Sequence, residues 1–411
     1  MAKPIGPVCN LDCCYCFYLE KEHLYPDKRQ APASAWAMPE PVLEAYIRQL
    51  IAAQPAPVVT FTWQGGEPTL LGLAYFRRVL ALQQRHARGK RIENCLQTHG
   101  MQLDDDWCAF LAGHRFLVGV SLDGPRHLHD RYRVDKGGRP TFDRVMDGVR
   151  LLKKHGVEFN TLTAVHAGNA EAPLEVYRFL REEGSGYMQF IPVVERHAGM
   201  PGIEGPRLVG PGWPGPAEVT PWSVTGSQYG GFLCAVFDAW VRQDVGRCYV
   251  QLFDAALEAW LGLPPSLCVF QETCGTALAL EHNGDLYACD HFVDGPHRLG
   301  NILDRPLEQL ARSRPQRDFG AAKRDTLPAV CRACDVRFVC QGECPKHRFA
   351  RTAAGEPGLN HLCAGYQSFF RHIDPCMRFM ADEIRRDGAP AHVMEWVRRR
   401  DARPEPPVSR P

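Results

Sequence analysis

The spacing of the cysteines constrains this chain more than any other feature. The 411 residues include 17 cysteines, and three near the start, Cys9, Cys13 and Cys16, form a C-x3-C-x2-C pattern. A disulfide scaffold would be far shorter and denser in cysteine. The spacing therefore favours metal ligation in a chain long enough for two or three domains.

Composition excludes several classes of protein. With 48 Lys+Arg against 47 Asp+Glu, the net charge of +1 excludes nucleic-acid binding by bulk charge. No run of 18 apolar residues predicts a transmembrane helix, and no apolar segment near Met1 predicts a signal peptide. We expect a cytoplasmic protein with reduced thiols and no membrane partner.

The first half of the chain alternates strand-like and helix-like stretches. Strands are predicted at 57–63, 92–97, 116–122, 157–165 and 187–194, and helices at 42–51, 73–87, 104–112, 142–155 and 171–183. Repeated βα units predict a parallel sheet closed fully or partly into a barrel, with the chemistry at the carboxyl ends of the strands.

The second half has a different character. Residues 199–216 hold 6 Gly and 5 Pro, which predicts a loop without regular structure. Helices are predicted near 227–243, 249–262, 364–386 and 390–400, and the last ten residues, with 4 Pro, are predicted to be disordered. The Cys-rich stretch 263–365 is predicted to depend on metal sites more than on an apolar core.

The first cysteine group suits an iron–sulfur cube. Three thiolates from one loop can hold three irons and leave the fourth iron open to a small molecule. A zinc site with His23 as fourth ligand stays possible on spacing alone, although it is less favoured.

The downstream cysteines suit two four-thiolate sites. They are Cys268, Cys274, Cys289, Cys331, Cys334, Cys340, Cys344 and Cys363. Two zinc ribbons are the alternative that spacing leaves open. The remaining six are interpreted as small buried hydrophobes: Cys14, Cys95, Cys108, Cys234, Cys248 and Cys376.

The surroundings of the first group carry a resemblance. Tyr15 precedes the third cysteine, and Gln64-Gly65-Gly66-Glu67-Pro68 closes a predicted strand. Together they resemble the radical S-adenosylmethionine (radical SAM) superfamily, in which the cysteine loop holds a [4Fe–4S] cluster and a GGEP motif contacts the amino group of S-adenosylmethionine. Gly65 and Gly66 would bring backbone carbonyls near that group, and Glu67 would add acceptor charge.

The downstream pattern resembles the SPASM extension of radical SAM enzymes that modify peptides. The resemblance implies two auxiliary [4Fe–4S] clusters, three clusters in all. Cys268, Cys274, Cys289 and Cys344 would hold the first auxiliary cluster, and Cys331, Cys334, Cys340 and Cys363 the second.

Longer strings resemble one family, the anaerobic sulfatase-maturating enzymes, from Lys3 to about Met380. They include KPIGPVCNLDCCYCFYLEK, NTLTAV, QFIPVVE and EHNGDLYACDHFV. The resemblance implies oxidation of a Cys or Ser in a sulfatase C/S-x-P-x-R motif to Cα-formylglycine, through a 5′-deoxyadenosyl radical. A flavodoxin or ferredoxin would donate electrons. The sequence distinguishes neither Cys-type from Ser-type substrates nor one oligomeric state from another.

The resemblance also assigns roles to single residues. Asp290, directly after Cys289, would be the base, and we expect it to favour its protonated form beside an anionic cluster. Its alternative role is to orient the cluster loop. The cofactor contacts would include Tyr15, Gly66, Ser121, Arg133 and Val194, each with an ordinary structural alternative, and Gln64 and Tyr18 could contact substrate.

The expected architecture is α/β, a partial (β/α)6 radical SAM barrel followed by a Cys-rich SPASM domain. The expected ranges are 1–225 for the barrel with a Gly/Pro-rich loop at 196–225, 226–262 for a helical connector, 263–386 for the SPASM domain and 387–411 for a helix and tail. Two departures from the family are a short first strand, which could reflect a truncated gene start, and His99 where Asn is usual.

Two other functions are alternatives to sulfatase maturation. Another SPASM enzyme, such as one forming thioether crosslinks, usually carries an N-terminal recognition domain, for which eight residues before Cys9 leave no room. A non-enzymatic zinc or iron–sulfur protein would leave the GGEP motif unexplained.

Overall fold

The computed structural model describes residues 1–28, 31–199 and 206–402. Its centre is one sheet with the strand order β10-β6-β5-β4-β3-β2-β1-β11-β12-β13. These strands are β1 (Ala2–Lys3), β2 (Val58–Trp63), β3 (Arg91–Thr98), β4 (Leu117–Ser121), β5 (Phe159–Val165), β6 (Tyr187–Pro192), β10 (Tyr249–Val250), β11 (Ala279–Glu281), β12 (Asp285–Tyr287) and β13 (Arg298–Asn301).

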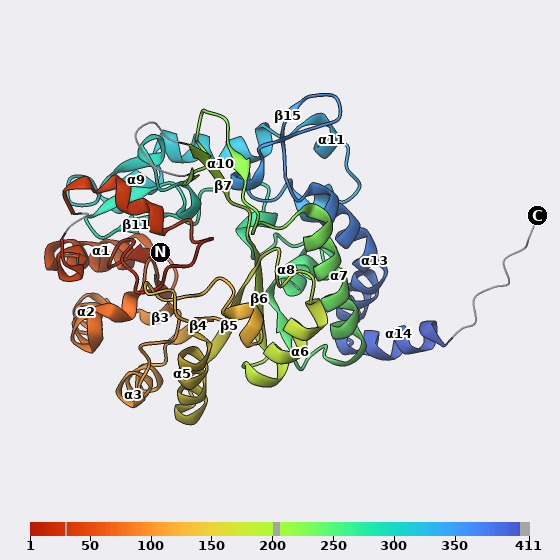
Figure 1. Cartoon of the computed structure of the whole chain (residues 1–411), viewed down its shortest axis with the longest axis horizontal. Helices are drawn as coiled ribbons and strands as arrows, with labels where there is room; N and C mark the ends of the chain where they lie inside the picture. Colours follow the sequence, from red (N-terminus) through yellow and green to blue (C-terminus); the bar gives the residue numbers. More distant parts are fainter. Residues whose placement is uncertain (29–30, 200–205, 403–411) are drawn as a thin grey trace, which may run out of the picture.

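Short β1 joins the two parts of the sheet. It pairs in parallel with β2 on one side and with β11 on the other, while β11, β12 and β13 are antiparallel. From β1 to β6 the strands are all parallel, which curves this half of the sheet into the partial barrel seen in Figure 1. The expected α/β barrel fold is confirmed.

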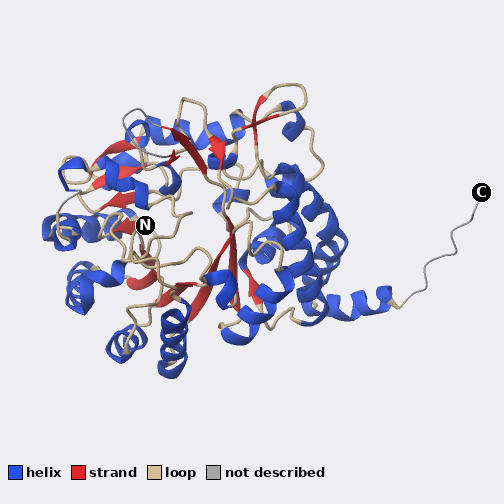
Figure 2. Cartoon of the chain, viewed as in Figure 1, coloured by secondary structure: helices blue, strands red, loops and turns tan. Residues whose placement is uncertain are grey.

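Helices follow the strands of the barrel and cover its outer side (Figure 2). The α-helices are α1 (Glu40–Ala53), α2 (Gly72–His86), α3 (Asp105–Gly113), α4 (Arg126–His129), α5 (Phe142–His155), α6 (Pro173–Glu183), α7 (Gly226–Gln243), α8 (Gln251–Trp260), α9 (Leu307–Ala311), α10 (Arg314–Asp325), α11 (Ala329–Arg332), α12 (Arg337–Cys340), α13 (Cys363–Arg385) and α14 (Val393–Asp401).

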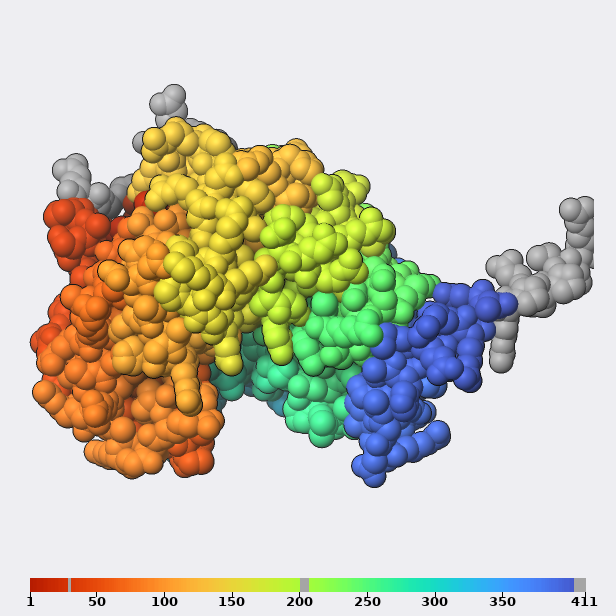
Figure 3. All heavy atoms as spheres, turned by 90° about the horizontal axis from the view of Figure 1, so that it is seen from below, coloured from red at the N-terminus to blue at the C-terminus, as the bar shows by residue number. Residues whose placement is uncertain are grey.

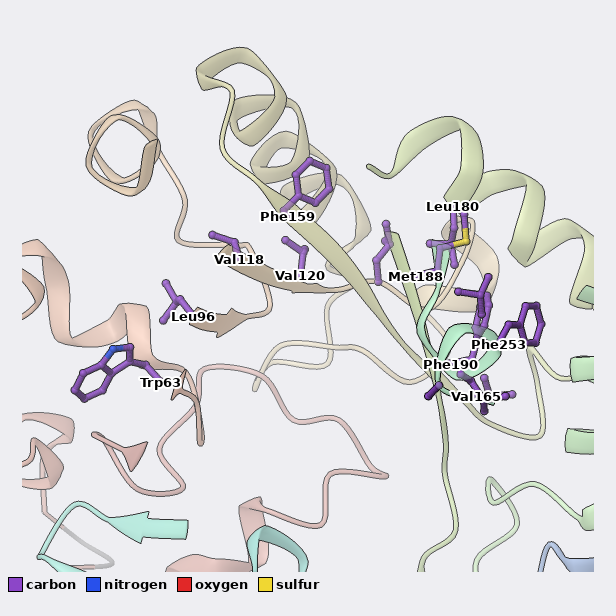
Figure 4. Packing of buried hydrophobic residues seen from close by; sticks show 14 of the residues in the cluster. Trp63, Leu96, Val118, Val120, Phe159, Val165, Leu180, Met188, Phe190 and Phe253 are labelled. Carbon is purple, nitrogen blue, oxygen red and sulfur yellow. The ribbon is translucent and has the colours of Figure 1, made fainter. Parts of the chain in front are cut away.

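The local sequence explains these elements, as α5 illustrates. Its buried residues Val145, Val149 and Leu152 recur at helical spacing, and Gly156, at φ 65°, ends the helix in the left-handed conformation. On the strands, successive side chains turn to opposite faces. Figure 4 shows some of the buried side chains, including Trp63 on β2 and Phe190 on β6, and they belong to one hydrophobic cluster.

Helices α7 and α13 pack against each other in the second half of the chain. The contact is close because two glycines meet there: a Cβ on Gly230 would lie 2.6 Å from Gly365 Cα. In the space-filling view of Figure 3, the blue C-terminal helices extend from the green segment that contains α7. This packing fixes the start of α13, where Cys363 lies.

The prediction of a loop without regular structure at 199–216 was wrong. The stretch 199–216 contains strand β8 (Pro206–Val209), which pairs with β7 (Arg196–Gly199), and β9 (Glu218–Val219) completes this small antiparallel sheet. A high content of Gly and Pro indicates turns, but it cannot show a short β-hairpin between those turns. The predicted helix 249–262 begins at Gln251 because Tyr249 and Val250 extend the sheet beside β6.

The Cys-rich stretch has more apolar packing than predicted. Phe270, Leu310 and Val339 are almost fully buried and belong to the same core as the barrel. Two antiparallel strands, β14 (Ala350–Arg351) and β15 (Pro357–Leu359), lie apart from the main sheet. The tail predicted to be disordered falls almost wholly outside the described residues. Within the described part of the chain, no helix is long and apolar enough to cross a membrane.

Candidate functional site

The loop that follows β1 brings three thiols to the carboxyl end of the barrel strands. Cys9, Cys13 and Cys16 line one cavity of about 140 Å³. Two contacts hold the loop: the Asp12 N–H donates to the Val134 carbonyl at 2.9 Å, and Leu11 forms a β-bridge with Asp135. The cysteine loop is therefore held at its start by β1 and farther along by its contacts with Val134 and Asp135.

The glycines of the GGEP turn let this turn pack directly on the cysteine loop. A Cβ on Gly66 would lie 1.9 Å from the Val8 carbonyl oxygen, so only glycine fits. The Gly66 N–H donates to the Gly6 carbonyl at 2.8 Å, and Gly65 has φ +137°. The glycines therefore have a structural role in addition to lining the cavity.

Glu67 ties the end of β2 to the end of β3. Its buried carboxylate accepts hydrogen bonds from Thr69 Oγ1 at 2.6 Å and Thr98 Oγ1 at 2.9 Å. It also accepts from the His99 N–H at 2.9 Å. These donors hold a negative charge at the cavity wall, as an ammonium ligand requires.

Most of the predicted cofactor contacts meet in this cavity. Besides the three cysteines, its lining includes Gly65, Gly66, Glu67, Gln97, Thr98, His99, Ser121 and Arg133. Tyr15 and Val194, also predicted as contacts, are absent from its described lining. Tyr15 is buried behind it, and Val194 lines a separate, larger cavity.

Arg133 is held at the cavity wall by a fully buried carboxylate that sequence analysis missed. Its Nε and Nη2 donate to the two oxygens of Asp123, at 2.8 and 3.1 Å, and the Tyr15 hydroxyl donates to the same carboxylate at 2.5 Å. Burial alone would raise the pKa of Asp123, but the Arg133 guanidinium lowers it and prevails. Asp123 lies two residues after the end of β4, and this position at the carboxyl end of a parallel strand is the signal that could have identified it.

His99 links the GGEP turn to the cysteine loop. Its Nδ1 accepts from the Met101 N–H at 3.1 Å, so Nε2 carries the proton and donates to Asn10 Oδ1 at 2.7 Å. Burial, ahead of the other influences, lowers its pKa below the ordinary histidine value, so the ring is neutral. The His99 side chain, which lies in the cavity wall, thus holds the cysteine loop through Asn10.

Burial keeps the three loop thiols protonated until a metal displaces the protons. It raises the pKa of Cys9 to about 12 and raises that of Cys13 and Cys16 as well. Metal binding to such thiols releases protons and is therefore coupled to pH. All 17 cysteines lie in the described part of the chain, and each is a free thiol. Of the six predicted to be small buried hydrophobes, Cys108 and Cys248 are buried, whereas the prediction is wrong for Cys14, which is exposed.

The structure brings one downstream set of four thiols around a single small cavity. Cys331, Cys334, Cys340 and Cys363 line it together with Asn360 and Tyr366. Contact with Cys363 lowers the pKa of Cys331 to about 7, against the effect of burial. A thiol that ionises near neutral pH is a ready metal ligand.

The other four downstream thiols also lie together. Burial raises the pKa of Cys344, and the charges of Cys289 and Cys274 raise it further. Burial also raises the pKa of Cys289 to about 12, and the charges of Asp290, Cys268 and Cys274 add to the rise. Within the described residues, no three His, Cys, Asp or Glu side chains are placed to hold a single metal ion.

A strained turn lies between Cys340 and Cys344, which belong to different sets of four thiols. Gln341, Gly342 and Glu343 have φ values of 47°, 70° and 53°, so three consecutive residues are left-handed between Cys340 and Cys344. Carbonyl groups of this turn accept hydrogen bonds from Arg348, including Gln341 O at 2.8 Å. Chain reversal at this point separates the two sets.

Asp290 is paired with a lysine that sequence analysis did not consider. Lys3, on β1, forms a buried ion pair with the Asp290 carboxylate, and its ammonium also lies 4.3 Å from the centre of the Tyr18 ring. Burial alone would raise the pKa of Asp290, but Lys3 and His291 lower it and prevail. Lys3 stabilises the negative charge of the carboxylate, so the structure favours an ionised Asp290 and not the protonated form expected from the sequence.

A second cavity of about 280 Å³ lies beside the cysteine loop. Its lining includes Phe17, Val194, His291, Lys346 and Phe349, so it draws on the barrel and on the Cys-rich region. The predicted substrate contacts Tyr18 and Gln64 are absent from the described lining of both cavities. The Tyr18 hydroxyl instead donates to Glu281.

Comparisons with known proteins agree with this architecture. Residues 4–180 match the radical SAM superfamily, and residues 268–335 match an iron–sulfur cluster-binding domain. The second match favours iron–sulfur clusters over zinc ribbons in the Cys-rich region.

Relatives match almost the whole chain. A serine-type anaerobic sulfatase-maturating enzyme of Bacteroides thetaiotaomicron is 45% identical over 97% of this chain and 94% of its own length. A cysteine-type enzyme of Clostridium perfringens is 31% identical over 94% of this chain and 98% of its own length.

A solved structure extends the comparison to three dimensions. The structure described as native anSMEcpe with bound AdoMet is 31% identical, with a TM-score of 0.79 over 93% of this chain and 98% of that one. The same protein has also been solved with AdoMet and the Cp18Cys peptide. On sequence and fold together, the chain belongs to the family of anaerobic sulfatase-maturating enzymes, which join a radical SAM domain to a SPASM domain.

Proposed function

We propose that this chain oxidises a serine or cysteine in a sulfatase to Cα-formylglycine, without oxygen and with S-adenosylmethionine. The observation that carries the proposal is the cavity in which Cys9, Cys13 and Cys16 meet Gly66 and Glu67. The chain is 45% identical to a sulfatase maturase over nearly its whole length, and this similarity supports the specific reaction.

The residues of this cavity suit a cluster with an open iron. The three thiols would hold three irons, and the cofactor would bind the fourth. Carbonyls of Gly65 and Gly66 and the carboxylate of Glu67 would receive the amino group. Arg133 keeps N–H groups that Asp123 does not use, and they suit the cofactor carboxylate.

Two further clusters complete the proposal, which makes three. Cys268, Cys274, Cys289 and Cys344 would hold one auxiliary cluster, and Cys331, Cys334, Cys340 and Cys363 the other. The first cluster and S-adenosylmethionine would supply the radical that removes a hydrogen from the β-carbon of the target residue, and the auxiliary clusters would accept the second electron. The small cavity shared by the second set supports its assignment.

Asp290 would accept the proton of the target hydroxyl or thiol. Lys3 supports this role because it keeps the carboxylate ionised and fixes its orientation. The next residue, His291, lines the cavity beside the cysteine loop, so a peptide there would lie near Asp290. We place the sulfatase peptide in that cavity.

Serine is our proposed target residue. The serine-type enzymes of Bacteroides thetaiotaomicron and Klebsiella aerogenes are 45% and 37% identical to this chain, against 31% for the cysteine-type enzyme of Clostridium perfringens. A flavodoxin or ferredoxin would supply electrons. The cytoplasm would supply the reducing conditions under which the free thiols bind iron.

The test uses anaerobically reconstituted full-length protein with S-adenosylmethionine, a reductant and matched peptides carrying Ser-x-Pro-x-Arg or Cys-x-Pro-x-Arg. We expect 5′-deoxyadenosine and an aldehyde-containing peptide, with the serine peptide converted faster. Release of 5′-deoxyadenosine without a change in either peptide would refute the maturase proposal. Faster conversion of the cysteine peptide would refute only the serine preference.

The cysteine loop offers a matched pair of variants. Cys16→Ala removes a proposed ligand, whereas Cys14→Ala removes an exposed thiol two residues away. We expect Cys16→Ala to abolish cleavage of S-adenosylmethionine and Cys14→Ala to leave it unchanged. Equal losses in both variants would contradict the assignment of the three ligands.

A further inference from the structure

His291 lies between the larger cavity and a cluster cysteine. Its ring lines the cavity of about 280 Å³, while its Nδ1 is 3.4 Å from the sulfur of Cys344. The ring meets the Phe17 ring edge-on at 5.4 Å, and Phe17 lines the same cavity. One face of this histidine therefore belongs to the proposed peptide site and one atom to the auxiliary site.

The chemistry of the pair fixes the direction of the hydrogen bond. A metal-bound thiolate has no proton to give, so the Cys344 sulfur can only accept. Nδ1 must then carry a proton and donate it in a hydrogen bond to the sulfur. Among the described residues, no other hydrogen bond of this ring is found.

Neighbours restrict the movement of the ring. Lys346, two residues after Cys344, places its ammonium 4.4 Å from the centre of the Phe17 ring and forms an ion pair with Glu195 at 2.5 Å. Phe17, Lys346 and His291 thus pack together between the cysteine loop, the end of β6 and the auxiliary site. All three residues belong to the lining of the proposed peptide cavity.

Donation to a ligand sulfur has a known electrostatic consequence. The bond stabilises negative charge on the cluster, which favours the reduced form and raises the reduction potential. A contact that changes the length or angle of this hydrogen bond would therefore change the reduction potential of the cluster. The cavity and the redox group are thereby coupled through one side chain.

We infer that His291 is a positioning residue that donates a hydrogen bond to Cys344 and couples occupancy of the peptide cavity to the potential of the first auxiliary cluster. The inference rests on the proposed function for the identity of the cluster and of the cavity ligand. It concerns no proton transfer by His291, which keeps its proton throughout.

The test compares two replacements in the reconstituted full-length protein. His291→Asn keeps an N–H donor near the position of Nδ1, and His291→Phe keeps a ring without a donor. Redox titration followed by electron paramagnetic resonance (EPR), with and without substrate peptide, reads the potentials. His372→Phe, at an exposed histidine on α13 bonded to Asp238, is the control.

We expect His291→Phe to lower the potential of one auxiliary cluster and His291→Asn to restore most of it. Addition of peptide should shift this potential in the unmodified protein and in His291→Asn, but not in His291→Phe. Equal potentials in all four proteins, or equal shifts in the Asn and Phe variants, would overturn the inference.

A second measurement needs no variant and covers the case in which His291→Phe fails to bind iron. Protein labelled with ¹⁵N-histidine should show a nitrogen and an exchangeable proton coupled to the reduced auxiliary cluster. Absence of both couplings would overturn the inference. A protein that shows them yet leaves every peptide unmodified would instead refute the proposed function.

Discussion

At the residue scale, Asp123 best illustrates how this site depends on charge. It is fully buried and meets Arg133, Tyr15 and the Ala164 N–H. A buried carboxylate is tolerated only when its charge is paired and hydrogen-bonded. The carboxylate therefore positions Arg133, which lines the cofactor cavity.

Replacement of Asp123 by Asn should destabilise the protein by about 3–5 kcal/mol near neutral pH, because it leaves Arg133 unpaired and buried. The folded-state pKa of Asp123 lies below its ordinary value, so the stabilisation is present above about pH 4 and is lost as pH falls further. Urea unfolding at several pH values measures both effects. A difference between the two proteins that grows on acidification would contradict this account.

Lys3 and Asp290 form the second informative pair of residues. Asp290→Asn should lower peptide turnover at least tenfold while iron content and cleavage of S-adenosylmethionine persist, because only the proton acceptor is lost. Lys3→Gln should also lower turnover, because it removes the cation that holds Asp290 ionised. Peptide mass spectrometry with an iron assay measures this. Full activity in Asp290→Asn would exclude its role as base.

At the element scale, the contact between the GGEP turn and the cysteine loop is decisive. Gly66→Ala would place a Cβ 1.9 Å from the Val8 carbonyl, so one of the two backbones must move. We expect this variant to lose the change that S-adenosylmethionine causes in the EPR spectrum.

Gly113→Ala, at the end of α3, is the matched control, because a Cβ there meets nothing within 4 Å. It should behave like the unmodified protein in the same experiment. A normal cofactor response in Gly66→Ala would show that the two loops do not need this close approach.

Helices α7 and α13 provide a second test on neighbouring glycines. A Cβ on Gly230 would lie 2.6 Å from Gly365 Cα, whereas a Cβ on Gly231 meets nothing within 4 Å. We expect Gly230→Ala to destabilise the protein by about 1–3 kcal/mol through overpacking. Gly231→Ala should stabilise it by up to about 1 kcal/mol through helix propensity. Thermal unfolding measures both, and equal effects would contradict the packing described.

Elements with strong periodicity could be predicted from the sequence, and short ones could not. Helix α5 and strand β5 follow from apolar spacing alone. Strand β10 depends on a partner distant in sequence, because Tyr249 and Val250 pair with β6. Two residues carry too little pattern to register such pairing.

The site divides in the same way. The spacing of Cys9, Cys13 and Cys16 and the GGEP turn at the end of a strand were visible as motifs, whereas the division of the downstream cysteines came from the family resemblance. Lys3 and His291 were missed because their roles arise from contacts across the fold, with Asp290 and with Cys344. Tyr15 was assigned to the cofactor, but in the structure its hydroxyl supports Asp123 behind the cavity wall.

At the scale of the whole molecule, β1 connects the two halves of the main sheet. Its two residues connect the parallel barrel to the antiparallel strands of the SPASM region in one sheet. The loop after β1 carries Cys9, and β1 itself carries Lys3. One short strand thus connects the cysteine loop to the proposed base, Asp290.

The central claim is that this arrangement converts a sulfatase residue to formylglycine. The most direct measurement is the mass of a Ser-x-Pro-x-Arg peptide after incubation with reduced, reconstituted protein and S-adenosylmethionine. The account predicts a peptide that has lost two hydrogens from the serine and gains a hydrazide label at the new aldehyde. An unchanged peptide, with 5′-deoxyadenosine still formed and a cysteine peptide equally unchanged, would contradict it.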